Sequence, residues 1–134
     1  MERGSLTIKT TRRFEVIDVT QDVGSWVESL GVGDGLLLAY VPHTTAAIVV
    51  NEGEPRLMED IIQFLRDLTK PGAQWKHNMI DVNAHAHLGN IILGDSRVIP
   101  VTGGKLSLGT WQRLLFIEMD GPRERTLQLV FIGQ

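Results

Sequence analysis

Apolar and polar residues alternate in some parts of the chain and form short apolar runs in others. Positions 5–11 alternate, with Leu6 and Ile8 on one face, which predicts a half-buried strand. The run at 36–41 is continuously apolar and bounded by turn residues, which is typical of a central strand covered on both faces. Similar short segments predict further strands at 14–19, 46–50, 98–101 and 106–108.

Two other segments carry apolar residues at helical spacing. Residues 20–30 place apolar side chains three or four positions apart, and Gly31 ends this predicted helix. Residues 55–68 form a longer apolar stripe, which Pro71 and Gly72 end. We therefore expect two amphipathic helices, each with one face packed against the strands.

The remaining segments give weaker signals. Residues 73–83 have no clear period and predict a loop, whereas residues 84–93 are compatible with a strand or with a short helix. Residues 110–119 and 125–132 resemble the two strands of a closing hairpin around the turn Asp120-Gly121-Pro122-Arg123.

Together these elements predict one α+β domain that spans residues 1–134, with several strands and two or three helices. A chain of this length is typical of a single domain and buries enough surface to fold without a metal ion or a disulfide. The regular alternation of strand and helix that a doubly wound parallel sheet requires is missing. The pattern therefore favours an α+β or sandwich-like arrangement.

Composition and charge exclude several functions. The chain has 13 Lys and Arg against 16 Asp and Glu, a net charge of −3, and so offers no basic surface to nucleic acid or to an anionic membrane. It has no cysteine, which excludes disulfides, a thiolate nucleophile and cysteine-bound metals. No apolar stretch approaches the ~18 residues of a membrane helix, and no signal peptide is evident. We expect a cytoplasmic protein.

The histidines are the first candidate functional residues. Without cysteine, imidazole and carboxylate are the transition-metal ligands that the chain offers, and three histidines with an open position form a known zinc arrangement. Two of them, in the sequence His-Ala-His, share a face on a strand but diverge by about 200° on a helix. The alternative is that all of them are surface or capping residues. The four are His43, His77, His85 and His87.

Charged residues near turns also allow two interpretations. Glu52 is a candidate general base, or simply a favourable charge near a helix N-terminus. An extended run from His43 to Glu52 covers roughly 30 Å, so the two share a site only if the strand bends or a neighbouring subunit supplies one of them. Arg123 and Arg125 flank a turn, where we expect solvated charge.

Six short strings in the chain resemble those of the YjbQ-like family, a group of uncharacterised proteins also described as secondary thiamine-phosphate synthases. They occur in the same order and extend the resemblance from about residue 6 to residue 133. The strings are Pro42–Ala47, Asn51-Glu52, Asn83–Leu88, Pro100–Leu106, Leu108–Gln112 and Asp120–Arg123.

The resemblance implies a twisted β-sandwich-like mixed sheet, a homotrimer, and weak thiamine-phosphate synthase activity beside an unknown main role. It implies a divalent metal ion of zinc type, because the family carries histidine at the positions of His43, His77 and His87, with His85 in reserve. The expected ligand is a small phosphorylated molecule. A zinc-type hydrolase with Glu52 as base, and a trimeric metal- or anion-binding module without turnover, are the alternatives.

Overall fold

The computed structural model describes residues 1–134 as two antiparallel β-sheets, three α-helices and one 3-10 turn. Sheet A has the strand order β1-β8-β3-β5-β6, and sheet B has the order β2-β7-β4. The strands are β1 (Glu2–Lys9), β2 (Glu15–Asp18), β3 (Gly35–Tyr40), β4 (Ala46–Asn51), β5 (Ser96–Thr102), β6 (Lys105–Leu106), β7 (Arg113–Glu118) and β8 (Glu124–Gly133).

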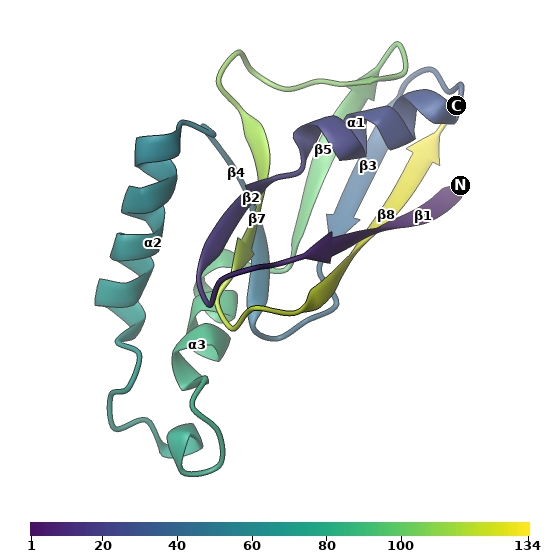
Figure 1. Cartoon of the computed structure of the whole chain (residues 1–134). Coiled ribbons are helices and arrows are strands. Elements are labelled where there is room, and N and C mark those ends of the chain that lie inside the picture. Colours follow the sequence, from purple (N-terminus) through teal and green to yellow (C-terminus); the bar gives the residue numbers. More distant parts are fainter.

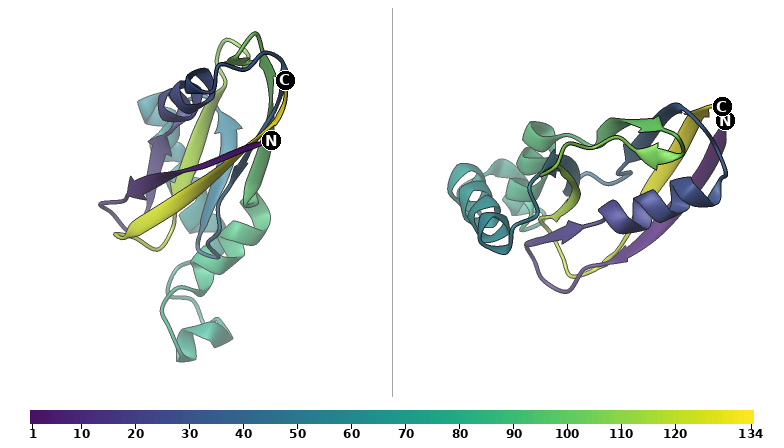
Figure 2. Two further views of the ribbon diagram at one scale, coloured as in Figure 1. Left: turned by 90° about the vertical axis from the view of Figure 1, so that its right-hand side faces the viewer. Right: turned by 90° about the horizontal axis from the view of Figure 1, so that it is seen from above.

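The helices lie along one edge and one face of this pair of sheets (Figure 1). Helix α1 (Thr20–Ser29) closes one side of the space between the sheets, while α2 (Pro55–Thr69) and α3 (Ala84–Leu93) cover the outer face of sheet B. The segment between α2 and α3, which contains the 3-10 turn η1 (Lys76–Met79), extends beyond the sheets (Figure 2). No helix is long and apolar enough to cross a membrane.

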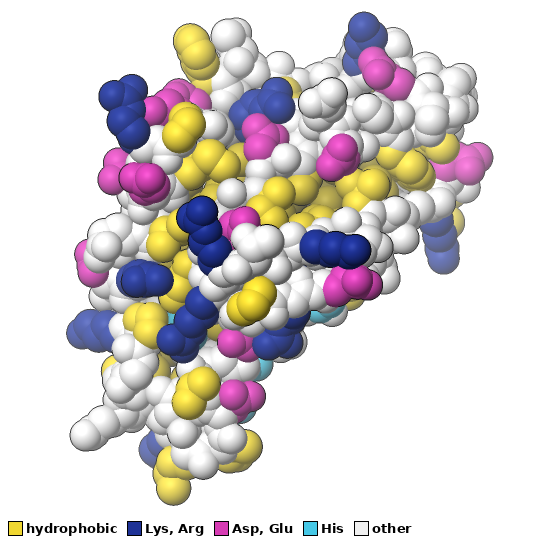
Figure 3. Space-filling view, viewed as in Figure 1, with side chains coloured by type: hydrophobic (Ala, Val, Ile, Leu, Met, Phe, Trp, Pro, Cys, Tyr) yellow, Lys and Arg dark blue, Asp and Glu magenta, His cyan; other side chains and the backbone are white.

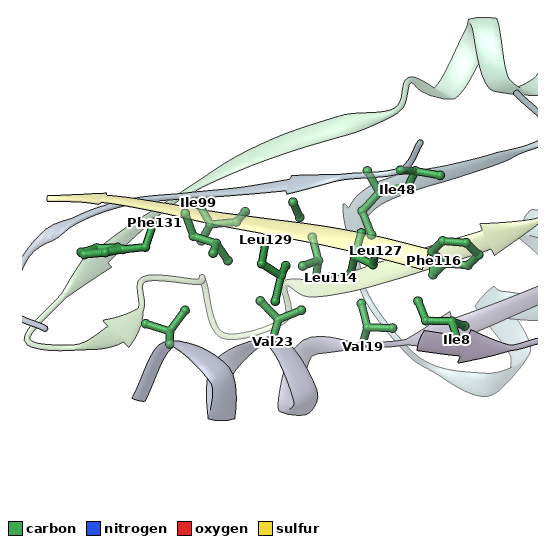
Figure 4. Close-up of a cluster of buried hydrophobic side chains, with 14 of the residues drawn as sticks. Ile8, Val19, Val23, Ile48, Ile99, Leu114, Phe116, Leu127, Leu129 and Phe131 are labelled. Atoms are coloured by element: carbon green, nitrogen blue, oxygen red, sulfur yellow. The ribbon is translucent and has the colours of Figure 1, made fainter. Parts of the chain in front are cut away.

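The main core fills the space between the two sheets. Alternate residues of β8 and β3 point inward, so that Leu127, Leu129 and Leu37 are fully buried. Leu114 and Phe116 of sheet B face them (Figure 4). Helix α1 adds the remaining wall through Val19, which precedes it, Val23 and Val27.

A second core lies between sheet B and the helices. Leu115 and Ile117 of β7 point away from the main core and pack with Leu65 of α2 and Ala86 of α3. Strand β7 is therefore buried on both faces, which fits its nearly continuous apolar sequence.

The predicted hairpin of the last two strands is wrong. Strand β7 already pairs with β2 on one edge and with β4 on the other, so neither edge is free for β8. Strand β8 pairs instead with β1 and β3 in sheet A, and residues 119–123 cross from one sheet to the other. A strand that already pairs along both edges cannot also pair with the next strand in sequence, so β7 and β8 do not form a hairpin.

Two further expectations are corrected. The α+β fold is confirmed, but every strand pair is antiparallel, so no sheet is mixed. Strand β3 is central in sheet A, yet only one of its faces is covered within the chain, because Leu37 is buried whereas Leu36 is 49% exposed. The ambiguous segment 84–93 is helix α3, and 73–83 is irregular apart from η1.

We expect Leu65→Ala to lower the free energy of unfolding by about 2–5 kcal/mol, because it leaves a cavity between α2 and sheet B. Leu68→Ala is the matched control, since it makes the same change on the same helix at a half-exposed position, and it should cost only about 0.5 kcal/mol. Urea unfolding of both variants measures the difference. Equal losses would contradict the packing of α2 through Leu65.

Candidate functional site

The three histidines that the resemblance singled out line one pocket of about 470 Å³, which we call the polar pocket. They come from three separate segments: the loop after β3, the turn η1 and helix α3. The fold therefore brings together side chains that are far apart in sequence. The lining residues are Pro42, His43, Thr44, Thr45, His77, Asp81, Asn83, His87, Arg123 and Arg125.

Arg125 lines the polar pocket from the protein interior. Its side chain is 2% exposed, and that of its ion-pair partner Glu118 is 0% exposed. Nε donates to Glu118 Oε1 at 2.8 Å, while Nη2 donates to Glu118 Oε2 and, at 2.8 Å, to Thr45 Oγ1. Nη1 has no hydrogen-bond partner within the chain, although the side chain as a whole is almost fully buried. Its N–H groups are available to a ligand where the pocket reaches them.

Glu118 holds this arginine as a carboxylate. It also accepts hydrogen bonds from Thr10 Oγ1 and from the backbone N–H groups of Met119 and Asp120. Burial raises the pKa of Glu118, but the hydrogen bonds from Arg125 and Thr10 outweigh this effect and bring the pKa below its ordinary value. The pair is therefore ionised on both sides at neutral pH.

The expectation of solvated charge at Arg125 is wrong, and the strand pattern contains the signal that identifies it as buried. Arg125, Leu127 and Leu129 alternate along β8 and share its inner face. Glu118 has the same parity as Leu114 on β7 and so faces the same core. The alternation thus places two opposite charges between the sheets, where a buried charge is stable only when it is paired.

His43 has its tautomer set by the backbone. Its Nε2 accepts the N–H of Thr126 at 2.9 Å, so in the neutral ring the proton sits on Nδ1, for which the chain supplies no acceptor. Burial, and then the charge of Arg125, lower the pKa of His43, which favours the neutral ring at pH 7. His43 therefore offers the pocket an N–H donor, and neither nitrogen has a free lone pair.

His77 has the opposite arrangement. Asn83 Nδ2 donates to Asp120 Oδ2 at 2.8 Å, which fixes the amide and leaves its Oδ1 to accept from His77 Nε2 at 3.0 Å. The lone pair of His77 is therefore on Nδ1. Its ring lies edge-on to His87, with ring centroids 4.8 Å apart. Asn83 precedes α3 but does not cap it with its side chain.

The residues of one chain do not complete the predicted metal site. Zinc takes at least three protein ligands, and no three His, Asp or Glu side chains lie together as such a set. His77 and His87 have lone pairs available, but both nitrogens of His43 are already committed in the neutral ring. The zinc-type ion stays a prediction, and it would need a rearranged His43 or ligands from elsewhere.

His85 does not reach the polar pocket. It lies on α3, where helical spacing turns it away from His87, and it is buried against Phe14 with ring centroids 5.2 Å apart. Its Nε2 donates to Met119 O at 2.9 Å, and its Nδ1 has no partner. Burial lowers the pKa of His85, and the charge of Arg13 adds to this effect.

Glu52 lies in a different pocket, of about 330 Å³, which we call the Glu52 pocket. Strand β4 is unbroken from Ala46 to Asn51, so His43 and Glu52 flank its opposite ends. The Glu52 pocket also contains Trp111 and the ion pair of Arg113 with Asp18 at 2.7 Å. Within one chain, the structure does not bring Glu52 to the histidines.

The chain matches the family model described as UPF0047 protein YjbQ-like over residues 4–134. The chain belongs to the YjbQ-like family. A hypothetical protein from Aeropyrum pernix K1 has a crystal structure that is 68% identical, covers 100% of both chains and superposes with a TM-score of 0.98. A YbjQ-like protein of unknown function from Sulfolobus solfataricus P2 is 47% identical over 99% of this chain and 97% of that one, with a TM-score of 0.97.

Curated relatives agree with this assignment. A UPF0047 protein of Archaeoglobus fulgidus is 55% identical over 120 residues, 90% of this chain and 93% of that protein. The UPF0047 protein YugU of Bacillus subtilis is 37% identical and covers 96% of this chain and 98% of its own length. The resemblance seen in the sequence strings is therefore confirmed.

The strings that carried the YjbQ-like resemblance fall into separate places on the structure. Residues of Pro42–Ala47, Asn83–Leu88 and Asp120–Arg123 line the polar pocket. Residues of Asn51-Glu52 and Leu108–Gln112 line the Glu52 pocket. The candidate base Glu52 and the three predicted histidines thus lie in two different pockets of one chain.

Acidification should destabilise this YjbQ-like protein. The pKa values of His43 and His85 in the folded chain lie below their ordinary 6.5, so the unfolded chain binds these protons first. The contribution of these two histidines to the free energy of unfolding is complete above about pH 6.5 and is lost as the pH drops toward their pKa values in the folded chain. Urea unfolding at pH 7.5 and 5.5, at fixed protein concentration, measures this loss.

His85→Gln tests which residue is responsible. The glutamine amide keeps a donor for Met119 O but does not titrate, so the loss between the two pH values should become smaller. If the variant loses as much stability as the wild type, the burial of a neutral His85 does not contribute.

Proposed function

We propose that the polar pocket binds the phosphate or diphosphate group of a small molecule. The observation that carries this is the buried guanidinium of Arg125, held on one edge by Glu118 with Nη1 left unpaired beside the pocket. Arg123 is half-exposed; its Nε donates to the backbone O of Asp120 and its Nη2 to Asp120 Oδ2, which leaves Nη1 without a partner. Guanidinium edges and fixed N–H donors match phosphate oxygens.

The donors of the pocket, rather than its net charge, support this function. His43 adds an N–H on Nδ1, and Thr44 adds a hydroxyl group. Asp81 is the one carboxylate among the lining residues; it would oppose a bare phosphate and accept from a hydroxyl or amino group of a larger ligand. The pocket therefore suits a phosphorylated molecule that also carries a hydrogen-bond donor.

The resemblance supplies the reaction to test first. Thiamine-phosphate synthesis joins a thiazole phosphate to a hydroxymethylpyrimidine diphosphate and releases diphosphate. Negative charge grows on the leaving diphosphate, and guanidinium N–H groups that are already oriented would stabilise it. Glu52, the base of the alternative zinc-type hydrolase, would reach the pocket only if a neighbouring subunit brings it there. Metal analysis of untagged protein tests the zinc-type ion.

Assembly as a homotrimer would cover the outer face of sheet A. Two rows of apolar side chains run across the strands on this face. Leu36 of β3 lies between Ile132 of β8 and Pro100 of β5. Two residues further along β3, Leu38 lies between Val130 and Val98. A contiguous exposed apolar surface of this kind marks an interaction site.

A second exposed apolar surface, unlike the first, supports a ring of copies. It lies on the segment between α2 and α3 and consists of Met79, Ile80 and Val82. Figure 3 shows hydrophobic side chains at this lower tip of the molecule. Contacts between two unlike surfaces run head to tail and form a ring when the rotation between copies closes, whereas a two-fold dimer uses one surface twice.

Arg123→Gln should weaken the binding of inorganic diphosphate about tenfold, since it removes a charged donor from the pocket. Arg56→Gln is the matched control: it removes the same charge at the start of α2, outside the polar pocket, and should leave the affinity unchanged. Asp81→Asn should strengthen binding. Isothermal titration calorimetry measures all three variants, and equal affinities throughout would contradict the assignment of this pocket.

Thiamine-phosphate formation from the two substrates is then assayed with the same variants. We expect the rate to fall with Arg123→Gln and to stay unchanged with Arg56→Gln. Diphosphate binding without any turnover would instead favour the anion-binding module.

Light scattering after size exclusion should give about three times 14.9 kDa. Val98→Asp, at a position 57% exposed on the outer face of sheet A, should reduce this mass because it places a charge in the contact. Phe64→Asp, at a 63% exposed position on α2, is the control and should not. A wild type that stays monomeric at high concentration would contradict the homotrimer.

A further inference from the structure

A second cavity, of about 450 Å³, shares two of its walls with the polar pocket. His77 and His87 line both spaces. The other lining residues are Gln74, Trp75, Lys76, Ala84 and Leu88, and the surface that the lining presents is mostly apolar. We call this space the apolar cavity.

The walls of the apolar cavity are held in place by their own elements. Trp75 Nε1 donates to Thr69 O at 3.0 Å, at the end of α2, so the one polar atom of the indole is already paired. The residue is nevertheless 38% exposed, which leaves part of the ring open to a ligand. On α3, Ala84 and Leu88 are four positions apart and so lie on one face of the helix.

The contrast between the two spaces defines the shape of ligand that would fill both. The polar pocket presents unpaired N–H groups of Arg123, Arg125 and His43. The apolar cavity presents an indole, aliphatic side chains and mostly apolar surface, with Gln74 and Lys76 also in its lining. His77 and His87 border both spaces, so the two spaces are neighbours.

We propose that the apolar cavity binds the planar, uncharged part of the phosphorylated ligand, so that the site selects phosphate esters of aromatic molecules over free phosphate and small alkyl phosphates. This inference rests on the proposed function of the polar pocket. Removing an aromatic ring from water is favourable, and the indole of Trp75 adds a stacking partner. The polar pocket then supplies attraction for the phosphate, and the apolar cavity supplies the selectivity.

The test compares three probes on the full chain by isothermal titration calorimetry: inorganic phosphate, methyl phosphate and phenyl phosphate. We expect phenyl phosphate to bind about tenfold more tightly than methyl phosphate, which shares its phosphate group but lacks the ring. Equal affinities of phenyl and methyl phosphate would overturn the apolar subsite and leave the polar pocket intact as a phosphate site. If none of the three binds, the proposed function of the polar pocket fails as well.

Leu88→Ser locates the effect in the apolar cavity. It should reduce the affinity for phenyl phosphate about fivefold and leave that for methyl phosphate within twofold. Ile92→Ser, an exposed change on the same helix outside the cavity, should alter neither. Trp75→Ala is not used, because it would also remove the hydrogen bond from the indole to Thr69 at the end of α2. The test therefore relies on Leu88→Ser and on the three probes with the wild type. If Leu88→Ser changes the mass of the assembly while both affinities stay the same, the cavity is a contact between copies.

Discussion

The buried ion pair of Arg125 and Glu118 connects nearly every part of the molecule that matters for the site. Arg125 belongs to β8 in sheet A and Glu118 to β7 in sheet B, so the pair ties the two sheets together at the end of the main core. Arg125 also binds the side chain of Thr45, two residues after His43, and Glu118 binds Thr10 after β1.

Burying two charges costs several kcal/mol per ion, and the pair offsets that cost only because its hydrogen bonds are nearly complete. The exception is Arg125 Nη1, which no residue of the chain satisfies. A pair selected for stability alone could be replaced by apolar residues of similar volume with little loss. The retained charge makes sense as a rigid donor, held from behind by Glu118 and presented to the pocket.

Hydrogen bonds from different neighbours give two histidines of the polar pocket opposite roles. The N–H of Thr126 makes His43 a donor through Nδ1, and the chain from Asp120 through Asn83 makes His77 an acceptor through the same atom type. The charge of Arg125 contributes to keeping His43 neutral. His43 thus presents a donor atom and His77 an acceptor atom in one pocket, whereas a three-histidine metal site needs three lone pairs.

Sequence periodicity predicted most strands and two of the three helices, α1 and α2, because burial on one face leaves a period of 2 or 3.6 in the chain. Periodicity did not predict which strands pair with each other. The apolar run of β7 indicates that both of its faces are covered, but not that β2 and β4 pair along its two edges. The tautomer of His43 depends on an amide 83 residues away and leaves no local trace.

The resemblance named three histidines that do share a pocket, but it could not show that Glu52 lies at the far end of β4. Arg125 was predictable, since its parity with Leu127 is visible in the sequence, yet a charge beside a turn is usually solvated. The general lesson is that strand parity deserves priority over distance from a turn when a charged residue is placed.

The outer face of sheet A links the proposed assembly to the site. The side chain of Thr126 has the same parity along β8 as Val130 and Ile132 and so lies on that same face. It is four residues from Val130 and six from Ile132. Its backbone N–H is the donor that fixes His43. In the proposed homotrimer, a neighbouring copy seated on Ile132 and Leu36 would pack on the strand that carries this amide. On this proposal the neighbouring copy supports the strand from outside, whereas the tautomer of His43 is already set within one chain by the N–H of Thr126.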